Sequence, residues 1–385
     1  MRNGVVIAGG GLAAQRCCET LRRLGYDGRV RIVCAENTAP YDRPPLSKDL
    51  LAGKLDRTAL HFRAPEWYAD NDVELLLDET GSGLDAARRR LRLADGDEIA
   101  YDRLVLATGS EPRRLPGTEG MANVYALRTA ADALHLREVL RPGMRLLVVG
   151  MGFIGQEVAA TARELAVEVT ALEAAPTPLH AILGERLGGW FAEMHRGEGV
   201  EVILGTPLAR LVGDGRAEAA ELADGRRIPC DAVVVGIGVV PAAAWLADSD
   251  LEAERGVAVD ERSRTALPGV YAAGDITGHQ HWEAAVRQGV SAARAIVGLP
   301  PAPAPPPYFW SDQYGVRIQC VGNPRGADGV LVEGDMGGRD FTALLSHDGR
   351  PVAALLVGRP AAMPAMRRLI QQQHQHTVTE ERRAA

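Results

Sequence analysis

The chain has 385 residues, 46% of them hydrophobic and 24% charged, with a formal net charge of −7. These values are ordinary for a globular protein of two to three domains, and they exclude disorder, collagen and coiled coil for the chain as a whole. The acidic balance argues against a general nucleic-acid binder, and no apolar run approaches the ~20 residues that span a bilayer. We expect a cytoplasmic protein, since the first apolar segment is too short for a signal peptide.

The first predicted unit reads strand, glycine turn, helix, strand. Residues 4–8 form a short apolar run, residues 12–24 have helical periodicity, and residues 30–35 predict the next strand. The same order returns about 140 residues later, with a strand at 145–149, a helix at 154–165 and a strand at 167–172. This recurrence indicates an internal duplication of a nucleotide-binding fold.

Short strands follow each of these units. They are predicted at 73–77, 90–93 and 103–107 after the first unit, and at 201–204, 208–212 and 232–235 after the second. Residues 300–307 read P-P-A-P-A-P-P-P, which is typical of an extended linker. Strand-like sequence then continues to residue 361, and the polar residues 371–385 are expected to fray.

The first glycine turn has the sequence Gly9-Gly10-Gly11-Leu12-Ala13-Ala14 and fits G-x-G-x-x-A between a strand and a helix. Glycines at these positions allow a tight turn and a close approach to a pyrophosphate, which the helix N-terminus attracts. Glu36 ends the next predicted strand, where a carboxylate can accept hydrogen bonds from a ribose diol. This combination predicts a dinucleotide site.

The second glycine turn, Gly150-Met151-Gly152-Phe153-Ile154-Gly155, is a full G-x-G-x-x-G in the same context. Glu173 ends the strand that follows, and an acid there favours a free 2′-hydroxyl over a 2′-phosphate. We therefore expect NAD in preference to NADP. Two dinucleotide sites in one chain indicate two dinucleotides, most simply a flavin and a nicotinamide.

The cysteines and histidines point to no redox dithiol and no metal centre. The cysteines are Cys17, Cys18, Cys34, Cys230 and Cys320. None of them forms a C-x-x-C pair, and the adjacent Cys17 and Cys18 are interpreted as small hydrophobic residues of a helix. The histidines lack the spacing of metal ligands.

Four further segments occur in order along the chain. They are Tyr41-Asp42-Arg43-Pro44-Pro45-Leu46-Ser47-Lys48, Ala107-Thr108-Gly109, Gly269-Val270-Tyr271-Ala272-Ala273-Gly274-Asp275 and Phe309-Trp310-Ser311-Asp312-Gln313. With the two glycine turns, they resemble FAD-dependent ferredoxin reductases of the putidaredoxin-reductase and biphenyl-dioxygenase-reductase type. This group belongs to the pyridine nucleotide-disulfide oxidoreductases but lacks their redox dithiol.

The resemblance implies an α/β fold with two Rossmann-like domains for FAD and NAD(P), arranged as in glutathione reductase, and a C-terminal α+β domain. It implies a discontinuous FAD domain at 1–114 and 234–299, an NAD domain at 115–233, a linker at 300–307 and a reductase domain at 308–385. The resemblance covers nearly the whole chain.

Carried over residue by residue, the resemblance gives two sets of cofactor residues. The residues expected at non-covalently bound FAD are Gly9, Gly11, Leu12, Ala13, Glu36, Arg43, Lys48, Gly81, Ala107, Thr108, Gly109, Arg128, Gly274, Asp275, Trp282 and Trp310. Those expected at NADH are Gly152, Phe153, Ile154, Glu157, Glu173, Gly236, Ile237 and Gly238. Lys48 and Glu157 are the expected catalytic pair, tuning the flavin by charge.

Simpler interpretations remain open for four of these residues. Arg128 would also suit a helix surface, Asp275 a helix N-cap, Trp310 a core position between domains and Glu157 a solvated helix face.

The function implied is the transfer of electrons from NADH through FAD to a [2Fe–2S] ferredoxin that serves a monooxygenase or dioxygenase. The alternatives are an NADH oxidase, an FAD-dependent reductase of a small organic molecule, and a redox-sensing flavoprotein without catalysis. We expect no nucleic-acid or membrane partner, and a monomer or homodimer.

The chain departs from the family at several positions. Thr177 and Ala181 stand where relatives usually carry arginines, Gln280 where they carry a glutamate, and Gly81 where valine often meets adenine. The loop 276–279 is short and lacks the usual arginines, so Arg317, Arg325 and Arg339 are the candidates for ferredoxin docking.

Overall fold

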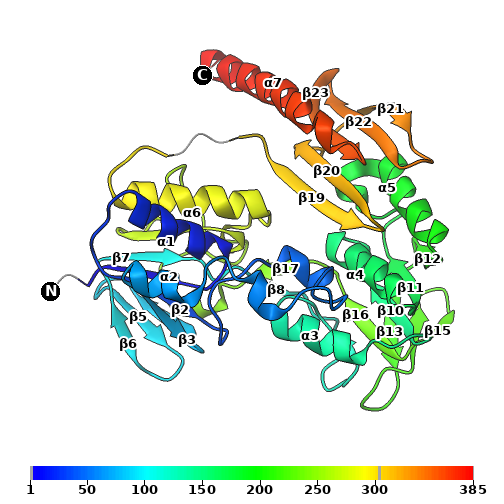
Figure 1. The fold of residues 1–385 in the computed structure, drawn as a ribbon, viewed down its shortest axis with the longest axis horizontal. Helices are drawn as coiled ribbons and strands as arrows, with labels where there is room; N and C mark the ends of the chain where they lie inside the picture. Colours follow the sequence, from blue (N-terminus) through cyan, green and yellow to red (C-terminus); the bar gives the residue numbers. More distant parts are fainter. Residues whose placement is uncertain (1–2, 302–304, 385) are drawn as a thin grey trace. The chain divides into compact units, whose positions relative to one another are not determined.

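The chain folds into two units, each built from stretches that are separated in the sequence (Figure 1). The computed structural model describes residues 3–301 and 305–384. Unit 1 comprises residues 1–42, 57–111 and 239–304, and unit 2 comprises residues 43–56, 112–238 and 305–385. Residues 302–304 of the expected linker lie outside the described residues, and the three-domain division stays a prediction.

Within its described residues, unit 1 contains a five-stranded parallel sheet, a three-stranded antiparallel sheet, one short strand that pairs outside these sheets, and three α-helices. Its strands are β1 (Val5–Ala8), β2 (Val30–Cys34), β3 (Val73–Leu77), β4 (Gly81–Asp85), β5 (Arg90–Leu93), β6 (Glu98–Ala100), β7 (Arg103–Leu106), the short β17 (Val239–Pro241) and β18 (Val270–Ala272). Its helices are α1 (Leu12–Arg23), α2 (Pro65–Asp70) and α6 (Trp282–Ile296), with short 3₁₀ turns at Arg57–Leu60, Ala244–Leu246 and Asp275–Thr277.

The parallel sheet of unit 1 has the order β18-β7-β1-β2-β3. All four residues of β1 are buried, as expected for a central parallel strand covered on both faces. Ile7 pairs with Ile32 on one side and Val105 on the other. The carboxyl end of β1 therefore leads its glycine turn directly to the edge where ligands bind in such sheets.

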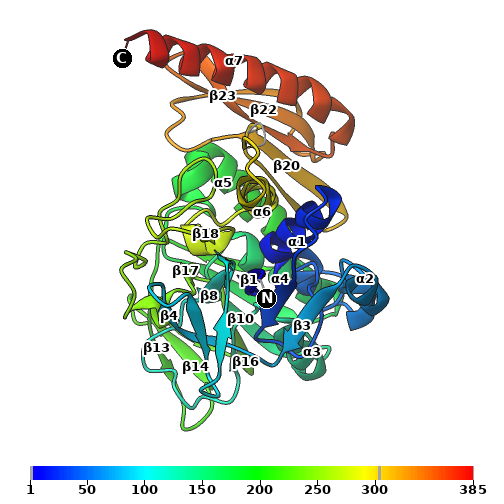
Figure 2. The same ribbon diagram turned by 90° about the vertical axis from the view of Figure 1, so that its left-hand side faces the viewer.

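Helices α1 and α6 pack closely against each other (Figures 1 and 2). The close approach requires a glycine at position 289 of α6. A Cβ atom there would lie 2.4 Å from the Ala13 carbonyl oxygen of α1. The contact fixes the first helix, whose N-terminus carries the first glycine turn.

Unit 2 repeats this arrangement and adds an antiparallel sheet from the C-terminal part of the chain. Its strands are β9 (Val124–Tyr125), β10 (Arg145–Val149), β11 (Glu168–Glu173), β12 (Glu201–Leu204), β13 (Leu208–Val212), β14 (Ala219–Leu222), β15 (Arg227–Pro229), β16 (Ala232–Val235), β19 (Tyr308–Gln313), β20 (Val316–Gly322), β21 (Gly329–Asp335), β22 (Asp340–His347) and β23 (Arg350–Val357). Its helices are α3 (Ala130–Val139), α4 (Phe153–Glu164), α5 (His180–Gly197) and α7 (Met363–Ala384), with 3₁₀ turns at Pro44–Ser47 (η1) and Pro360–Ala362. The short β8 (Ser110–Pro112) lies where the chain passes from unit 1 to unit 2.

The parallel sheet of unit 2 has the order β12-β11-β10-β16-β9, and β13, β14 and β15 form a small antiparallel sheet. The strand, glycine turn, helix, strand order of unit 1 thus recurs, which confirms the predicted duplication. The expected strand 4–8 begins at Val5 and the expected helix 154–165 begins at Phe153. Differences of one residue are ordinary at element ends.

The C-terminal sheet has the order β19-β20-β23-β22-β21. Leu187 and Phe191 of α5 are fully buried against one face, together with Phe341 of β22. Helix α7 covers the other face through Ile370 (Figure 2). The expectation that residues 371–385 fray is wrong for the described part, since α7 continues to Ala384. The expected fold class, two nucleotide-binding sheets plus a C-terminal α+β part, is confirmed.

Candidate functional site

The first glycine turn of unit 1 is shaped for a close approach of the backbone to a ligand. Gly9 has a φ of 124°, and a Cβ there would lie 2.0 Å from the Ala107 carbonyl oxygen. A Cβ at Gly11 would meet no heavy atom within 4 Å, so the turn leaves open space beside this residue. Gly11 is also the N-cap of α1 and no side chain caps the helix. Its first N–H groups are therefore placed to receive a phosphate.

Glu36 follows β2 at the same edge of the sheet. Tyr41 donates a hydrogen bond of 2.7 Å from its hydroxyl to Glu36 Oε2. Trp282 Nε1 donates to Asp42 Oδ1 at 2.9 Å, so α6 holds the next residue of the chain. The predicted residues Glu36 and Trp282 are thus tied to the same short segment at Tyr41 and Asp42.

The turn at Gly274 and Asp275 follows β18, at the same carboxyl edge of the parallel sheet of unit 1. Ser110 donates from Oγ to Asp275 Oδ2 at 2.7 Å. Gln288, a buried residue of α6, accepts the Gly274 N–H at 2.8 Å and donates to Thr277 Oγ1 at 2.9 Å. Sequence reasoning missed Gln288, because a glutamine inside an amphipathic helix carries no motif.

Three other expected residues of unit 1 lie around this edge. Thr108 Oγ1 donates to the Ala242 carbonyl oxygen at 2.7 Å. Gly109 has a φ of 78°, which favours glycine. Gly81 begins β4, and a Cβ there would make ordinary contact with the ring of Trp245 at 3.6 Å.

The second glycine turn, in unit 2, has the same construction. Gly150 has a φ of 94°, and a Cβ there would lie 2.6 Å from the Gly236 carbonyl oxygen. At Gly155 a Cβ would lie 2.0 Å from the Gly150 carbonyl oxygen, so this position in the first turn of α4 requires glycine. Gly152 is the N-cap of α4, again without a side-chain cap. A Cβ at Gly152 would lie 3.8 Å from the same Gly236 carbonyl oxygen, so these two residues expected at NADH lie close together.

Glu173 lies at the end of β11 and faces this turn. Its Oε2 accepts the Met151 N–H at 2.8 Å, and its Oε1 accepts the Ala175 N–H at 2.9 Å. Both carboxylate oxygens are therefore fixed by backbone donors, and the negative charge stays at the mouth of the turn.

Two large apolar side chains stay exposed beside the second turn. Ile154 is 44% exposed and Ile237 is 36% exposed, although both follow buried strands. Phe153 packs instead on Phe309 of β19, with ring centroids 4.9 Å apart. Exposed isoleucines next to a glycine turn suit the stacking of a flat ring.

The family departures have structural counterparts in unit 2. Thr177 is buried and its Oγ1 lies 3.2 Å from His180 Nδ1. Ala181 lies exposed in the first turn of α5. Neither position offers a positive charge to a phosphate.

Glu157 of α4 gathers three donors from segments far apart in the sequence. Lys48 Nζ lies 2.9 Å from Glu157 Oε1, Ser47 Oγ donates to Oε2 at 2.5 Å, and Ser311 Oγ of β19 donates to Oε1 at 2.7 Å. Glu157 is 4% exposed, which excludes the interpretation as a solvated helix residue. The predicted Lys48–Glu157 pair is present, and the two serines were missed.

Arg43, Arg128 and Trp310 are further expected residues of unit 2, as is Gly238, which has a φ of 94°. The Arg43 guanidinium donates to the Arg128 carbonyl oxygen. Arg128 directly precedes Thr129, which caps α3. Trp310 stacks on Tyr308 with centroids 5.8 Å apart, and the Arg317 guanidinium lies 5.9 Å from its ring centroid.

A fully buried histidine lies behind the second glycine turn. His195 of α5 contacts the Tyr314 hydroxyl through Nδ1 at 2.7 Å and Gln156 Oε1 through Nε2 at 3.3 Å. Gln156 donates in turn to the Met151 carbonyl oxygen at 3.0 Å. Burial lowers the pKa of His195 to about 4, against a smaller opposing effect of Gln313. His195 is therefore neutral at pH 7.

The cysteines are buried and unpaired. Burial raises the pKa of the Cys17 thiol, and the neighbouring Cys18 adds to this shift. Burial also raises the pKa of the Cys34 thiol to about 12. A thiol that stays protonated is a poor nucleophile, which supports the structural interpretation of the cysteines.

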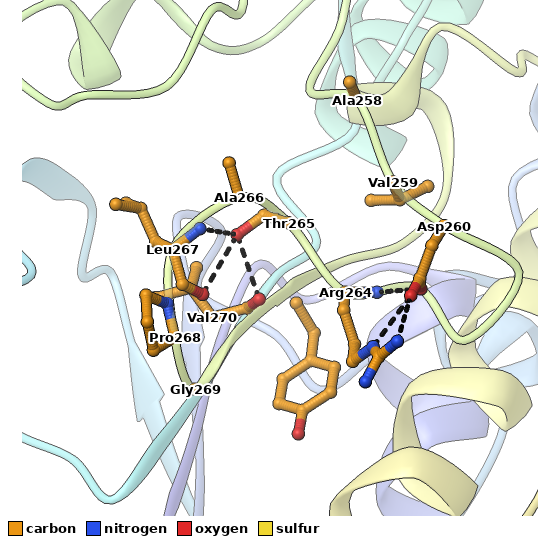
Figure 3. Close-up of a pocket in the computed structure, with 11 residues that line it drawn as sticks. Ala258, Val259, Asp260, Arg264, Thr265, Ala266, Leu267, Pro268, Gly269 and Val270 are labelled. Carbon is orange, nitrogen blue, oxygen red and sulfur yellow. Dashed lines mark hydrogen bonds and ion pairs between the residues drawn. The ribbon is translucent and has the colours of Figure 1, made fainter.

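A pocket of about 590 Å³ lies near the amino end of β18 in unit 1 (Figure 3). Its polar groups are paired among themselves: Arg264 Nε donates to Asp260 Oδ2 at 2.7 Å, and Thr265 Oγ1 donates to the Val270 carbonyl oxygen at 3.0 Å. None of the expected site residues lines it. Ligands of parallel sheets bind at the carboxyl ends of the strands, so we do not assign the pocket to the site.

Two observations bear on other partners. The exposed side chains of Asp328, His347 and Asp348 lie within reach of one another. His347 Nδ1 lies 3.3 Å from Asp328 Oδ2, and we assign this cluster no metal. Among the described residues, no helix combines the length and apolar character that a membrane crossing needs.

Each unit therefore fits one dinucleotide. The fit rests on an uncapped helix N-terminus, a glycine with open space in front of it, and a carboxylate at the end of the next strand. Glu36 and Glu173 take equivalent places in the two units. Phosphate binding to backbone N–H groups and ribose binding to a carboxylate follow from this donor and acceptor set.

Comparison with known proteins matches the chain in two successive regions. Residues 3–289 match the family model described as pyridine nucleotide-disulphide oxidoreductase, and residues 308–383 match the model described as reductase C-terminal. The biphenyl dioxygenase system ferredoxin–NAD(+) reductase component of Paraburkholderia xenovorans is 37% identical over 383 residues, which is 96% of this chain and 93% of the relative. Putidaredoxin reductase of Pseudomonas putida is 34% identical over 386 residues, which is 96% of this chain and 92% of the relative.

A solved structure is similar over the same extent. The covalent putidaredoxin reductase–putidaredoxin complex contains a chain that matches with a TM-score of 0.93 and 32% identity. The match covers 96% of this chain and 93% of the solved one.

Proposed function

The chain belongs to the pyridine nucleotide-disulphide oxidoreductase family, and from this premise we propose that it is an NADH-dependent ferredoxin reductase. The resemblance drawn from the sequence motifs is thereby confirmed. The proposed acceptor is a [2Fe–2S] ferredoxin that serves a monooxygenase or dioxygenase. It is supported by the names of the relatives and by the solved complex with a ferredoxin.

The observation that carries the proposal is the presence of two candidate dinucleotide sites without a redox dithiol. Each unit has its own glycine turn and strand-end carboxylate. The cysteines are buried, and none belongs to a C-x-x-C pair. Since no dithiol can take the electrons onward, they leave to an external acceptor.

The residues of the chain divide the work. Non-covalently bound FAD would supply the redox chemistry, which is uptake of a hydride from NADH and release of its electrons one at a time. Gly9, Gly11 and Glu36 would hold its adenosine and pyrophosphate side, and Asp275 would meet the ribityl chain. Lys48, which lies 2.9 Å from Glu157, would supply a positive charge that favours the reduced flavin. These groups tune and orient, and no residue serves as an obligatory acid or base.

The nicotinamide cofactor is NADH in this proposal. Glu173 at the second turn repels a 2′-phosphate, while Ile154 and Ile237 offer an apolar surface for the nicotinamide ring. Thr177 and Ala181 carry no charge, so NADH is held with less electrostatic attraction than in relatives that have arginines there. The proposed setting is the cytoplasm, because unpaired cysteines suit a reducing compartment.

The test combines cofactor analysis with acceptor assays. The purified protein should release FAD on heating, identified by mass, and should reduce cytochrome c with NADH only when a ferredoxin is added. Release of FMN, or of no flavin, overturns the cofactor assignment. Rapid oxygen uptake with NADH alone, without stimulation by ferredoxin, indicates the oxidase instead.

A second function is favoured by one feature. The loop 276–279 and Gln280 carry no arginine, although an acidic ferredoxin would favour one near this turn. A reductase of a small organic molecule needs no such charge. It is indicated if ferredoxin fails as acceptor while a quinone or another small oxidant is reduced quickly.

A further inference from the structure

The carboxylate of Glu157 is held by three side chains, of which only one is charged. Lys48 Nζ and Ser311 Oγ share Oε1, at 2.9 and 2.7 Å, while Ser47 Oγ donates to Oε2 at 2.5 Å. Both serines are almost completely buried, at 0% and 1% exposure. The ion pair therefore lies in a closed hydrogen-bonded setting, where each donor counts for more than it would in water.

The direction of the Ser311 hydroxyl is set by a second residue of β19. Gln313 lies two residues further along the strand, hence on the same face, and donates from Nε2 to Ser311 Oγ at 3.0 Å. A hydroxyl has one proton and two lone pairs. Because Gln313 occupies a lone pair, the single proton of Ser311 is free to point at Glu157.

Ser47 is fixed from the other side. Its backbone carbonyl oxygen accepts a 2.7 Å hydrogen bond from Thr161 Oγ1, one turn beyond Glu157 on α4. A further turn along the helix, Glu164 pairs with Lys54 at 2.6 Å. The segment 43–56 is thus fastened to one face of α4, and it presents the Ser47 hydroxyl to Glu157 in a fixed place.

We propose that Ser311, oriented by Gln313, is a positioning residue that fixes the Glu157 carboxylate against Lys48. The C-terminal sheet then contributes to the reactivity of the flavin site through a hydrogen bond. Without the Ser311 hydroxyl, Lys48 Nζ is the one remaining hydrogen-bond donor to Glu157 Oε1. The carboxylate can then rotate, and the ammonium group of Lys48 loses its fixed position. This inference rests on the proposed function, in which Lys48 acts on the flavin.

The test compares Ser311→Ala with Ser311→Thr, which keeps the hydroxyl on a strand-compatible side chain. Ser346→Ala on β22 makes the same change on the same sheet outside this network. We measure the midpoint potential of the bound flavin by photoreduction, and the rate of flavin reduction by NADH in a single turnover from pH 6 to 9. The infrared carboxylate band that is lost in Glu157→Gln reports the carboxylate itself.

We expect Ser311→Ala to slow flavin reduction roughly 10-fold, to change its pH profile and to shift the potential and the infrared band. Ser311→Thr should restore wild-type values, and Ser346→Ala should not differ from wild type. In a Glu157→Gln background the Ser311→Ala effect should fall to within about 2-fold, because the carboxylate charge that Ser311 would position against Lys48 is gone.

Two results overturn the inference. One is a Ser311→Ala protein that loses thermal stability while its potential, infrared band and rate per bound flavin equal those of wild type. The other is an unchanged Ser311→Ala effect in the Glu157→Gln background. If NADH does not reduce the wild-type flavin, the proposed function fails, and the potential and infrared band still decide the role of Ser311.

Discussion

Lys48 Nζ lies 2.9 Å from Glu157 Oε1, and the side chains are 15% and 5% exposed. An ion pair that is so little exposed to water interacts more strongly than a surface pair. Its partners come from segments more than 100 residues apart, so it links the loop after Tyr41 to the helix after the second glycine turn.

We expect substitutions at the two residues of this pair to shift the midpoint potential of the bound flavin in opposite directions. Lys48→Met should make the flavin harder to reduce and slow hydride transfer, because a positive charge that favours the reduced form is lost. Glu157→Gln should shift the potential in the other direction. Shifts of about 30 mV, equal to ~1.4 kcal/mol in a two-electron couple, are expected. Spectroscopic redox titration checks this, and unchanged potentials in both variants would remove the pair from the mechanism.

Glu173 leads to a prediction on the choice of nucleotide. Its carboxylate is fixed by the Met151 and Ala175 N–H groups, so its charge cannot swing away from a 2′-phosphate. We expect kcat/KM for NADH to exceed that for NADPH by a factor on the order of 10² or more. Glu173→Gln should narrow this ratio. Glu168→Gln, on the exposed end of the same strand, is the matched control and should leave it unchanged.

His195 leads to a prediction on stability and pH. Its folded-state pKa of about 4 lies below its ordinary value of 6.5, because burial disfavours the charged ring. Between pH 6.5 and 4 the unfolded chain takes up a proton that the folded chain does not, so the free energy of unfolding falls as the pH falls. The total loss from this residue is ~3 kcal/mol.

Urea unfolding at several pH values checks this effect. His195→Gln should be less stable than wild type at pH 7, since the Tyr314 hydroxyl loses its partner. The difference should shrink toward pH 4, because the variant has no proton to take up. The exposed His135→Gln variant should follow the wild-type curve. A difference that stays constant over this range would contradict the assigned pKa.

Gly289 leads to a prediction on packing. A Cβ there would lie 2.4 Å from the Ala13 carbonyl oxygen and 3.2 Å from the Cys17 backbone nitrogen. Gly289→Ala should therefore destabilise the protein by about 1–3 kcal/mol and loosen the flavin, since α1 must move. Gly189→Ala in α5 meets no atom within 4 Å and should gain about 0.5–1 kcal/mol. Equal melting temperatures of the two variants would refute the packing argument.

Much of the architecture could be predicted from the sequence because its signals are local. A buried strand, a glycine turn and a helix lie within about 20 residues. In each unit the next strand is followed or ended by a carboxylate that completes the candidate dinucleotide site. Gly9 and Gly150 show the reason, since each has a positive φ, and a Cβ there would collide with the backbone oxygen of the residue that follows a neighbouring strand.

The supporting residues could not be predicted, because their partners are distant and their types are common. Ser311 meets Glu157 across 154 positions, and Tyr314 meets His195 across 119. A serine or a glutamine in a strand carries no signal of its own. The expected fraying of the C-terminal tail was wrong for a related reason. Composition alone does not show that a helix begins at Met363 and packs on the sheet through Ile370.

The docking of ferredoxin leads to the last prediction. Of the three arginines proposed, Arg339 has the least exposed side chain, at 25%, and it pairs with Glu198 at 2.6 Å and lies over the Tyr314 ring. Arg317 is 48% exposed beside Trp310, with its Nε 3.7 Å from Asp312 Oδ1, and Arg325 is exposed. We expect the double variant Arg317→Glu and Arg325→Glu to slow ferredoxin reduction, because an acidic partner is then repelled.

Ionic strength provides the independent check. The rate of ferredoxin reduction should fall as salt rises past 0.1 M, where the screening length is about 10 Å. Reduction of a small neutral dye by NADH should not change with salt or with the double variant. Arg88→Glu, a single reversal of the same kind at a side chain that is 83% exposed, is the control and should leave both rates at the wild-type level. If ferredoxin reduction is indifferent to salt and to both arginines, charge steering at this surface is excluded, and an acceptor recognised without charge becomes the better explanation.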